Sequence, residues 1–264
     1  MIKVEDVFVV FFSGTPLERV ALRGLNFSLK EGEVVSILGN NGSGRSTLLR
    51  FLAGHITASF GRVWLDKVDM TGQSLSQRSQ YFSAVFYDED VGTAGNLTVA
   101  ENLAIATMHH QPRSIIYPAI DFEMRDMFHQ QLKDLDLMGL ELLMDEKVCN
   151  LSKAQRHVLS LLISVIKETK ILLIDEHSTG LDRDSSSALL EATEKIIRSK
   201  NMTTIMAVSD PQFALRVSDR ILVLSHGQIV SNIEVKDNKN IKLEDIFVSF
   251  NVVPPIKDIV PPAC

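Results

Sequence analysis

The first third of the chain contains short runs of β-branched, aromatic and other apolar residues, separated by turn-forming residues. Such runs at 7–12 (VFVVFF), within 20–39 and at 61–70 (GRVWLDKVDM) predict β-strands. Residues 45–55 (RSTLLRFLAGH) have apolar positions at helical spacing instead, and Gly54 is placed to end a helix. We therefore expect strands in this part, with one helix that directly follows a strand and a glycine-rich loop.

Helical spacing of the apolar residues dominates from about residue 96 to residue 166. This stretch predicts three helices, at 98–110, 122–143 and 151–169. Thr98 and Glu101, three residues apart, form the pattern of a capping box at the start of the first helix. Ser152 is expected to be the N-cap of the third helix.

Beyond this stretch the chain returns to alternating strands and helices. The short apolar run 170–175 (KILLID) predicts a buried parallel strand. Further elements are predicted at 185–200 (helix), 203–208 (strand), 212–218 (helix), 220–225 (strand) and 228–235 (strand). The pattern indicates one α/β domain over 1–250 with a helical insertion at about 96–166. The proline-rich segment 251–264 predicts an extended or disordered tail.

The composition narrows the possible partners. The net charge of −6 argues against a nucleic-acid binder, because neutralising phosphates requires a basic face. No apolar run approaches the roughly 20 residues that span a bilayer, so we expect membrane contact only through a partner. Cys149 and Cys264 lack the spacing of a metal site, which makes reduced thiols in the cytosol the default expectation.

The segment GNNGSGRST at 39–47 is close to the phosphate-binding pattern G-x-x-x-x-G-K-[ST], with Arg45 in place of lysine. Backbone N–H groups of such a loop, together with the positive end of the following helix, form a cradle for anions. Ser46 would provide a hydroxyl to Mg²⁺ and Thr47 would contact an α-phosphate. The alternative is a glycine-rich turn without a ligand. The predicted nucleotide contacts are Gly39, Asn40, Asn41, Gly42, Ser43, Gly44, Arg45, Ser46 and Thr47.

Asp175 ends the apolar run at 170–175, and a second acid, Glu176, follows it directly. An acidic pair after a buried strand can place Asp175 in the shell of a Mg²⁺ ion and Glu176 beside an attacking water. The alternative is an acidic strand end that faces solvent. The phosphate-type loop earlier in the chain favours the catalytic interpretation.

Several ordered motifs make the sequence similar to the ATP-binding subunits of ABC transporters. LSKAQR at 151–156 stands where that family has its signature LSGGQ, and STGLD at 178–182 resembles its D-loop. NLTVAENL at 96–103 resembles the segment where the helical lobe meets the membrane subunit, and SDRILVLSHGQIV at 218–230 resembles the strand-turn-strand beyond the switch. The resemblance covers roughly residues 2–250 and is greatest to a bacterial importer subgroup.

This resemblance implies an α/β fold of the P-loop NTPase type, with a RecA-like core, an antiparallel β subdomain and an inserted helical lobe. It implies ATP and Mg²⁺ as ligands. The implied partners are an integral membrane permease, a second ATP-binding subunit in a homo- or heterodimer, and a substrate-binding protein. The implied location is peripheral, at the cytoplasmic face of the cell membrane.

The sequence departs from the family pattern at positions that carry chemistry. Tyr87 aligns with the Q-loop glutamine and Ser209 with the switch histidine that contacts the γ-phosphate. Lys153 and Ala154 replace the two signature glycines, and we expect their side chains to obstruct the approach of backbone N–H groups to that phosphate. Ser152 and Gln155 of the signature remain, as does Asp182 of the D-loop. With Arg45 among the departures, the sequence predicts an impaired ATPase site.

Phe12 aligns with the aromatic residue on which the family stacks adenine, and the alternative is a core residue of a strand. Three functions remain open. The chain is a catalytically weak subunit of a transporter, an active homodimeric ATPase that tolerates Arg45, or a nucleotide-sensing or scaffolding protein without a membrane partner.

Overall fold

The computed structural model describes residues 1–86, 92–107, 120, 122–166, 169–175, 181–235, 241 and 243–250. These residues divide into two compact units. The first is drawn from Met1–Ala84, Lys170–His177 and Met202–Cys264, and the second from Val85–Thr169 and Ser178–Asn201. No helix in the described ranges is both long and apolar enough to span a membrane.

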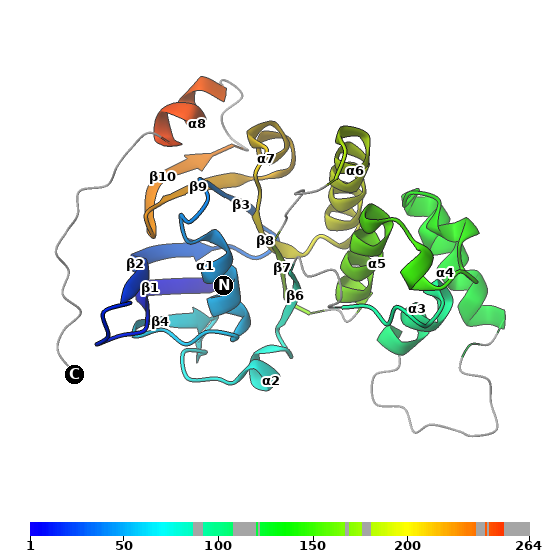
Figure 1. Ribbon diagram of the computed structural model, residues 1–264, viewed down its shortest axis with the longest axis horizontal. Helices are drawn as coiled ribbons and strands as arrows, with labels where there is room; N and C mark the ends of the chain where they lie inside the picture. Colours follow the sequence, from blue (N-terminus) through cyan, green and yellow to red (C-terminus); the bar gives the residue numbers. More distant parts are fainter. Residues whose placement is uncertain are drawn as a thin grey trace. The chain divides into compact units, whose positions relative to one another are not determined.

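The first unit contains two sheets (Figure 1). A four-stranded antiparallel sheet has the order β2-β1-β4-β5, formed by β1 (Ile2–Phe11), β2 (Arg19–Leu29), β4 (Phe60–Leu65) and β5 (Val68–Asp69). A six-stranded sheet has the order β10-β9-β3-β8-β7-β6, formed by β3 (Val34–Gly39), β6 (Phe82–Phe86), β7 (Ile171–Asp175), β8 (Thr203–Ala207), β9 (Arg220–Ser225) and β10 (Gln228–Glu234). The helices of this part are α1 (Arg45–Ala53), α2 (Leu75–Arg78), α7 (Pro211–Val217) and α8 (Leu243–Phe250).

The central strands of the six-stranded sheet are parallel. β3 pairs with β8 and β9, and β7 pairs with β8, all in parallel register. Every residue of β7, β8 and β9 is buried, which is the pattern of a strand covered on both faces. The prediction of a buried parallel strand at 170–175 is confirmed.

Helix α1 packs against both sheets of the first unit. It packs against β7 and β8 of one sheet and also contacts β2 of the other (Figure 1). Its side chains Leu48, Leu49, Phe51 and Leu52 are completely buried, and such burial stabilises by about 1.5–3 kcal/mol for each side chain. Gly54 follows in the left-handed conformation as the C-cap, as the sequence predicts.

A buried arginine anchors the far end of α1. Arg78 is 1% exposed, and its guanidinium donates to the carbonyls of Phe51 and Leu52 at 2.6 and 3.0 Å, and to those of Met70 and Thr71 at 2.7 and 3.1 Å. A cation at a helix C-terminus also interacts favourably with the helix dipole. This contact fixes the helix whose other end carries the glycine-rich loop.

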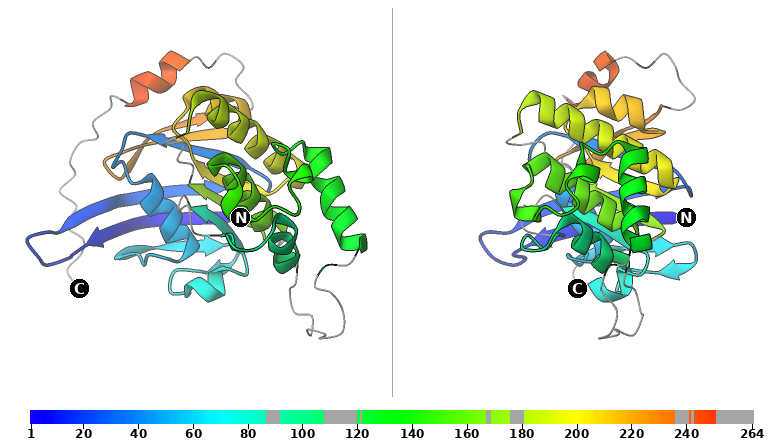
Figure 2. Two further views of the ribbon diagram at one scale, coloured as in Figure 1. Left: turned by 45° about the vertical axis from the view of Figure 1, so that its right-hand side comes forward. Right: turned by 90° about the vertical axis from the view of Figure 1, so that its right-hand side faces the viewer.

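Apart from Val85 and Phe86 at the end of β6, the regular elements of the second unit are helical within the described residues. Its elements are α3 (Val99–Thr107), α4 (Phe122–Leu135), the short 3₁₀ turns η1 (Leu140–Leu142) and η2 (Val148–Asn150), α5 (Lys153–Ile166) and α6 (Arg183–Lys200). Helix α5 packs against α6 (Figure 2). This unit has a helix in each of the three stretches expected to be helical at 96–166, and it takes in α6 as well. The helix expected at 122–143 ends at Leu135, before the turn η1.

The predicted caps of two helices are present in this unit. At the start of α3, Glu101 Oε2 accepts from the Thr98 backbone N–H at 2.7 Å, and Thr98 Oγ1 accepts from the Glu101 N–H at 3.2 Å. Ser152 Oγ accepts from the Gln155 N–H at 3.2 Å, directly before α5. Both contacts lie within four residues along the chain, which explains why sequence alone predicts them.

Candidate nucleotide-binding site

Strand β3 runs into the glycine-rich loop, and the loop runs into α1. Gly42 and Gly44 have φ values of 79° and 108°, which favour glycine. A Cβ on Gly44 would lie 2.9 Å from the Ala21 carbonyl oxygen and 2.9 Å from Leu22 Cδ2, so no other residue fits there. Gly44 is the N-cap of α1 without a side-chain cap, and the first turn contains no acid. The first N–H groups of α1 are therefore left for an external anion.

A recess of about 180 Å³ lies over this loop. Its lining consists of loop residues 40–47 together with Phe11, Arg19 and Ala21 from the neighbouring β1 and β2. A Cβ on Gly42 would lie 3.7 Å from Arg19 Nη2, so a second guanidinium stands beside the cradle. Sequence reasoning missed Arg19, because nothing in the local pattern shows that β2 passes the loop.

The aromatic residue that lines the recess is Phe11. Phe12 lies one residue beyond the end of β1, with a φ of 54° and 68% of its surface exposed. This exposure excludes the alternative of a core strand residue at Phe12. Its stacking with adenine remains a prediction, and Phe11 is now a second candidate for that role.

Strand register brings the acidic end of β7 to the loop. Asp175 lies opposite Ala207 of β8, and Ala207 lies opposite Ile37 of β3. The Ser46 hydroxyl donates to Asp175 Oδ1 at 3.2 Å, and Asp175 is 3% exposed. A hydroxyl and a carboxylate are the hard oxygen ligands that Mg²⁺ uses beside nucleotide phosphates, so these two residues fit the ion. Within the described ranges, no group of three His, Cys, Asp or Glu side chains could hold a metal ion.

Arg45 is tied to the end of β8. Its Nη1 donates to the carbonyl oxygen of Val208 at 2.7 Å, and the residue is half-buried. Burial lowers the pKa of Arg45, and the nearby Asp175 carboxylate opposes that shift. The guanidinium stays protonated at neutral pH, and four of its five N–H donors remain for other partners. The sequence identified this arginine as unusual but could not show its partner.

Ser209 directly follows the carbonyl that holds Arg45. It is exposed, and its side chain makes no hydrogen bond to the described part of the chain. The next residue, Asp210, caps α7 by accepting from the Gln212 N–H at 2.8 Å. Ser209, which aligns with the switch histidine, therefore lies in the short connection between β8 and α7. Arg45 holds one end of this connection at Val208, and Asp210 fixes the other end as the cap of α7.

The retained signature residues help to begin α5 in the second unit. Besides the Ser152 cap, Gln155 Oε1 accepts from the Ser152 N–H at 3.0 Å and Gln155 Nε2 donates to the Met138 carbonyl at 3.2 Å. Lys153 is exposed, whereas Ala154 is 1% exposed. Lys153 therefore presents its side chain at the surface, whereas the Ala154 methyl group points into the unit. Obstruction of the approach of backbone N–H groups to a phosphate remains a prediction.

Asp182 is the N-cap of α6. It accepts from the Ser185 N–H at 2.9 Å and from the Ser185 hydroxyl at 2.7 Å, and these hydrogen bonds lower the pKa of Asp182. The predicted site residues Tyr87 and Glu176 lie outside the described residues. Nucleotide contacts of Ser152, Gln155 and Asp182 remain predictions, since these residues belong to the second unit.

Comparison with known proteins shows the family of the chain. Residues 22–179 match the model of the ABC transporter family. The tyrosine transport ATP-binding protein of Clostridioides difficile is 36% identical over 226 residues, covering 86% of this chain and 89% of that protein. The energy-coupling factor transporter ATP-binding protein EcfA2 of Acetivibrio thermocellus is 27% identical, covering 86% and 78%.

Solved structures show the same fold. The ATP-binding cassette MJ0796, in a dimeric post-hydrolysis state bound to ADP and Pi, superposes with a TM-score of 0.72 at 23% identity, covering 89% of this chain and 99% of the other. The structure of cbiO1 from Clostridium perfringens gives 0.72 at 25% identity, covering 89% of each chain. The predicted α/β fold of the P-loop NTPase type is confirmed. The chain belongs to the ABC transporter family and is an ATP-binding cassette of that family.

Proposed function

We propose that this chain is the ATP-binding subunit of an importer complex, that it holds ATP with Mg²⁺, and that it hydrolyses ATP slowly. It acts at the cytoplasmic face of the membrane with an integral permease, a second ATP-binding subunit and a substrate-binding protein. Relatives named as import proteins, such as the sulfate/thiosulfate import ATP-binding protein CysA of Nitrosomonas europaea, support the direction of transport. Because a relative at 36% identity is named for tyrosine transport, tyrosine is the first cargo to assay.

The cradle supports nucleotide binding. Uncapped N–H groups at the start of α1 and the glycines at 42 and 44 provide donors for the phosphate chain. Ser46 and Asp175 would hold Mg²⁺, which when bound neutralises charge on the terminal phosphates. Since these two residues are the described protein ligands, we expect the ion to bind well only together with nucleotide.

The observation that carries the proposal of slow hydrolysis is the hydrogen bond between Arg45 and Val208. A lysine ammonium is a compact point charge on a flexible stem and can follow charge as it moves during transfer. The Arg45 guanidinium is planar and donates a hydrogen bond to a backbone carbonyl at 2.7 Å. It can therefore bind phosphate, but it cannot move with the charge during transfer. Ser209 beside it is too short to contact a γ-phosphate directly. Each lost donor of this kind costs about 2.7–4 kcal/mol in the transition state.

A heteromeric complex follows from the same reasoning. In the family, the signature of each subunit contacts the nucleotide bound by the other subunit. A homodimer of this chain would therefore have two altered sites. A second, different ATP-binding subunit with an unaltered loop would provide one site with complete loop and switch residues. We therefore propose that this chain pairs with such a subunit.

The test combines nucleotide titration with an ATPase assay, on the chain alone and on the complex purified with its permease. We expect ATP binding with micromolar to millimolar affinity and turnover far below about 1 s⁻¹, the lower end of common kcat values. Glu176→Gln is the matched control for activity that comes from a contaminating ATPase. Ordinary turnover of the isolated chain that Glu176→Gln abolishes would support the active homodimer instead. Failure to co-purify with a permease would support the scaffolding function.

A further inference from the structure

The recess over the glycine-rich loop is lined by an arginine from each of two parts of the chain. Arg45 is the first residue of α1 and belongs to the loop side of the recess. Arg19 is the first residue of β2 and lines the recess from the antiparallel sheet. Among the described residues that line the recess, these two arginines are charged and none is an acid. The recess therefore has positive charge from two elements, of which the loop pattern accounts for only one.

Strand pairing places the Arg19 side chain beside the loop. Arg19 lies opposite Phe11 in the antiparallel pair of β1 and β2, so the two side chains share one face of the sheet. A Cβ on Gly42 would lie 3.7 Å from Arg19 Nη2. Because Gly42 has no side chain, a ligand can approach the loop backbone and the guanidinium together.

The N–H donors of Arg19 are not used by the described part of the chain. Its guanidinium makes no hydrogen bond or ion pair there. The neighbouring carboxylate of Glu18 instead accepts from the backbone N–H of Gly14 at 2.8 Å. Every donor of this exposed guanidinium is therefore open to a ligand, whereas Arg45 already gives one donor to Val208.

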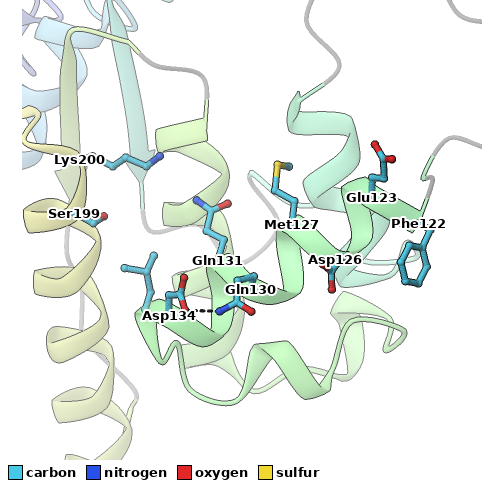
Figure 3. A pocket seen from close by; sticks show the side chains of 10 residues that line it. Phe122, Glu123, Asp126, Met127, Gln130, Gln131, Asp134, Ser199 and Lys200 are labelled. Atoms are coloured by element: carbon cyan, nitrogen blue, oxygen red, sulfur yellow. Dashed lines mark hydrogen bonds between the residues drawn. The ribbon is translucent and has the colours of Figure 1, made fainter.

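The larger hollow of the second unit has the opposite charge. It lies between α4 and α6 and has a volume of about 700 Å³ (Figure 3). Glu123, Asp126 and Asp134 line it, and Lys200 is the cation among its described lining residues. The excess of carboxylates repels a phosphate chain. We therefore expect one polyphosphate to bind per chain, at the recess over the loop.

We propose that Arg19 binds the phosphate chain of the nucleotide, at the phosphates that ATP and ADP share. Because Arg19 lines the same recess, this proposal rests on the proposed function. Arg19 shares its sheet with Phe11, a candidate for stacking with adenine, whereas Ser46 and Asp175 mark the Mg²⁺ side at the end of β7. The phosphates nearer to the base are therefore those within its reach. The planar fork of a guanidinium can donate two parallel hydrogen bonds to one such phosphate.

A contact with these phosphates is present before, during and after transfer of the terminal phosphate. It stabilises the ground state and the transition state equally, so it lowers KM without raising kcat. Arg19 is therefore a nucleotide-binding residue and not a catalytic residue. Its removal should raise KM for ATP and leave turnover at saturating ATP unchanged.

Binding of three probes to the full chain tests the contact: ATP and ADP by titration calorimetry, and inorganic pyrophosphate by displacement of a fluorescent ADP. We expect Arg19→Ala to weaken the binding of each probe by roughly tenfold, since each presents the same phosphate contact. Arg19→Lys keeps the charge without the fork and should recover part of the loss. Unchanged affinity for ADP, or a loss that pyrophosphate does not share, would overturn the proposal. A larger loss for ATP than for ADP would also overturn it, because Arg19 would then act on the terminal phosphate.

Arg62→Ala is the matched control for the loss of one positive charge. Arg62 is an exposed arginine of β4 in the same sheet, has no hydrogen bond to the described residues and does not line the recess. Its replacement should leave the affinity for all three probes unchanged, and an equal loss in this control would overturn the proposal.

The melting temperature without ligand separates binding from folding. Arg19→Ala should melt with the unmodified chain, because the side chain has no partner in the described part of the protein. A lower melting temperature would assign the loss of affinity to the fold and overturn the proposal. If the unmodified chain binds neither ATP nor ADP, the proposed function fails as well. If it binds both and Arg19→Ala binds them equally, only the role of Arg19 fails.

Discussion

Replacing Arg45 by lysine tests how the cradle is connected to the end of β8. The change restores the residue type of the phosphate-loop pattern but removes the Nη1 hydrogen bond to Val208. Hydrogen bonds to charged groups contribute about 1.5–3 kcal/mol, and we take the lower value because Arg45 is only half-buried. A loss of about 1.5 kcal/mol lowers the melting temperature by roughly 3–6 °C in a protein of this size.

The effect on activity depends on the neighbouring residue 209. Arg45 bonds the carbonyl directly before Ser209, so changes at the two positions should not be additive. We expect Arg45→Lys to raise turnover by less than about tenfold, because the γ-phosphate still lacks the histidine contact. Ser209→His alone should have little effect, since the tethered guanidinium lies beside it. The double variant should gain about 10²–10³-fold, the value of one restored transition-state donor.

Steady-state ATPase assays of the four proteins, with calorimetry for stability, give the full double-mutant cycle. Lys195→Arg, a surface substitution in the other unit, is the control for a general effect of exchanging lysine and arginine. A double variant whose gain is only the product of the two single effects would refute the coupling. An Arg45→Lys protein with unchanged stability would show that the bond to Val208 contributes nothing.

The other predictions concern the loop, the ion, the adenine pocket and a cap. Gly44→Ala should abolish nucleotide binding and cost about 1–3 kcal/mol of unfolding free energy, measured by urea denaturation, because of its φ of 108° and the crowded Cβ position. Asp175→Asn should remove most of the Mg²⁺ dependence of ATP affinity in titration calorimetry, and equal Mg²⁺ dependence would contradict the assigned ligand. Phe11→Ala should weaken ATP affinity more than Phe12→Ala, since Phe11 lines the recess. Asp182→Ala should lower the melting temperature at neutral pH. Because the folded-state pKa of Asp182 is lowered, the stability that its carboxylate contributes is present above the unfolded pKa of about 3.9 and is lost as the pH falls through the folded-state pKa. The melting temperatures of the two proteins should therefore become equal in acid.

Local interactions made much of this chain predictable. The caps at Thr98 and Ser152 and the helix end at Gly54 depend on residues within four positions of each other, so the residue types were sufficient. The parallel strand at 171–175 was predictable because burial on both faces requires a continuous apolar run. The strand β6 and the helices α2 and α8 were not predicted.

The sequence by itself determined the order of most strands and helices, the glycine-rich loop and the identity of every altered residue around it. Tertiary structure decided which of these residues meet. Ser46 and Asp175 are 129 positions apart, and Arg45 and Val208 are 163 apart, yet each pair forms a hydrogen bond. It is the parallel register of β3, β8 and β7 that sets these distances. Strand register depends on packing of the whole sheet, which no local pattern records. For that reason the sequence could mark Arg45 as unusual, while only the fold showed that it is held by the strand end beside Ser209.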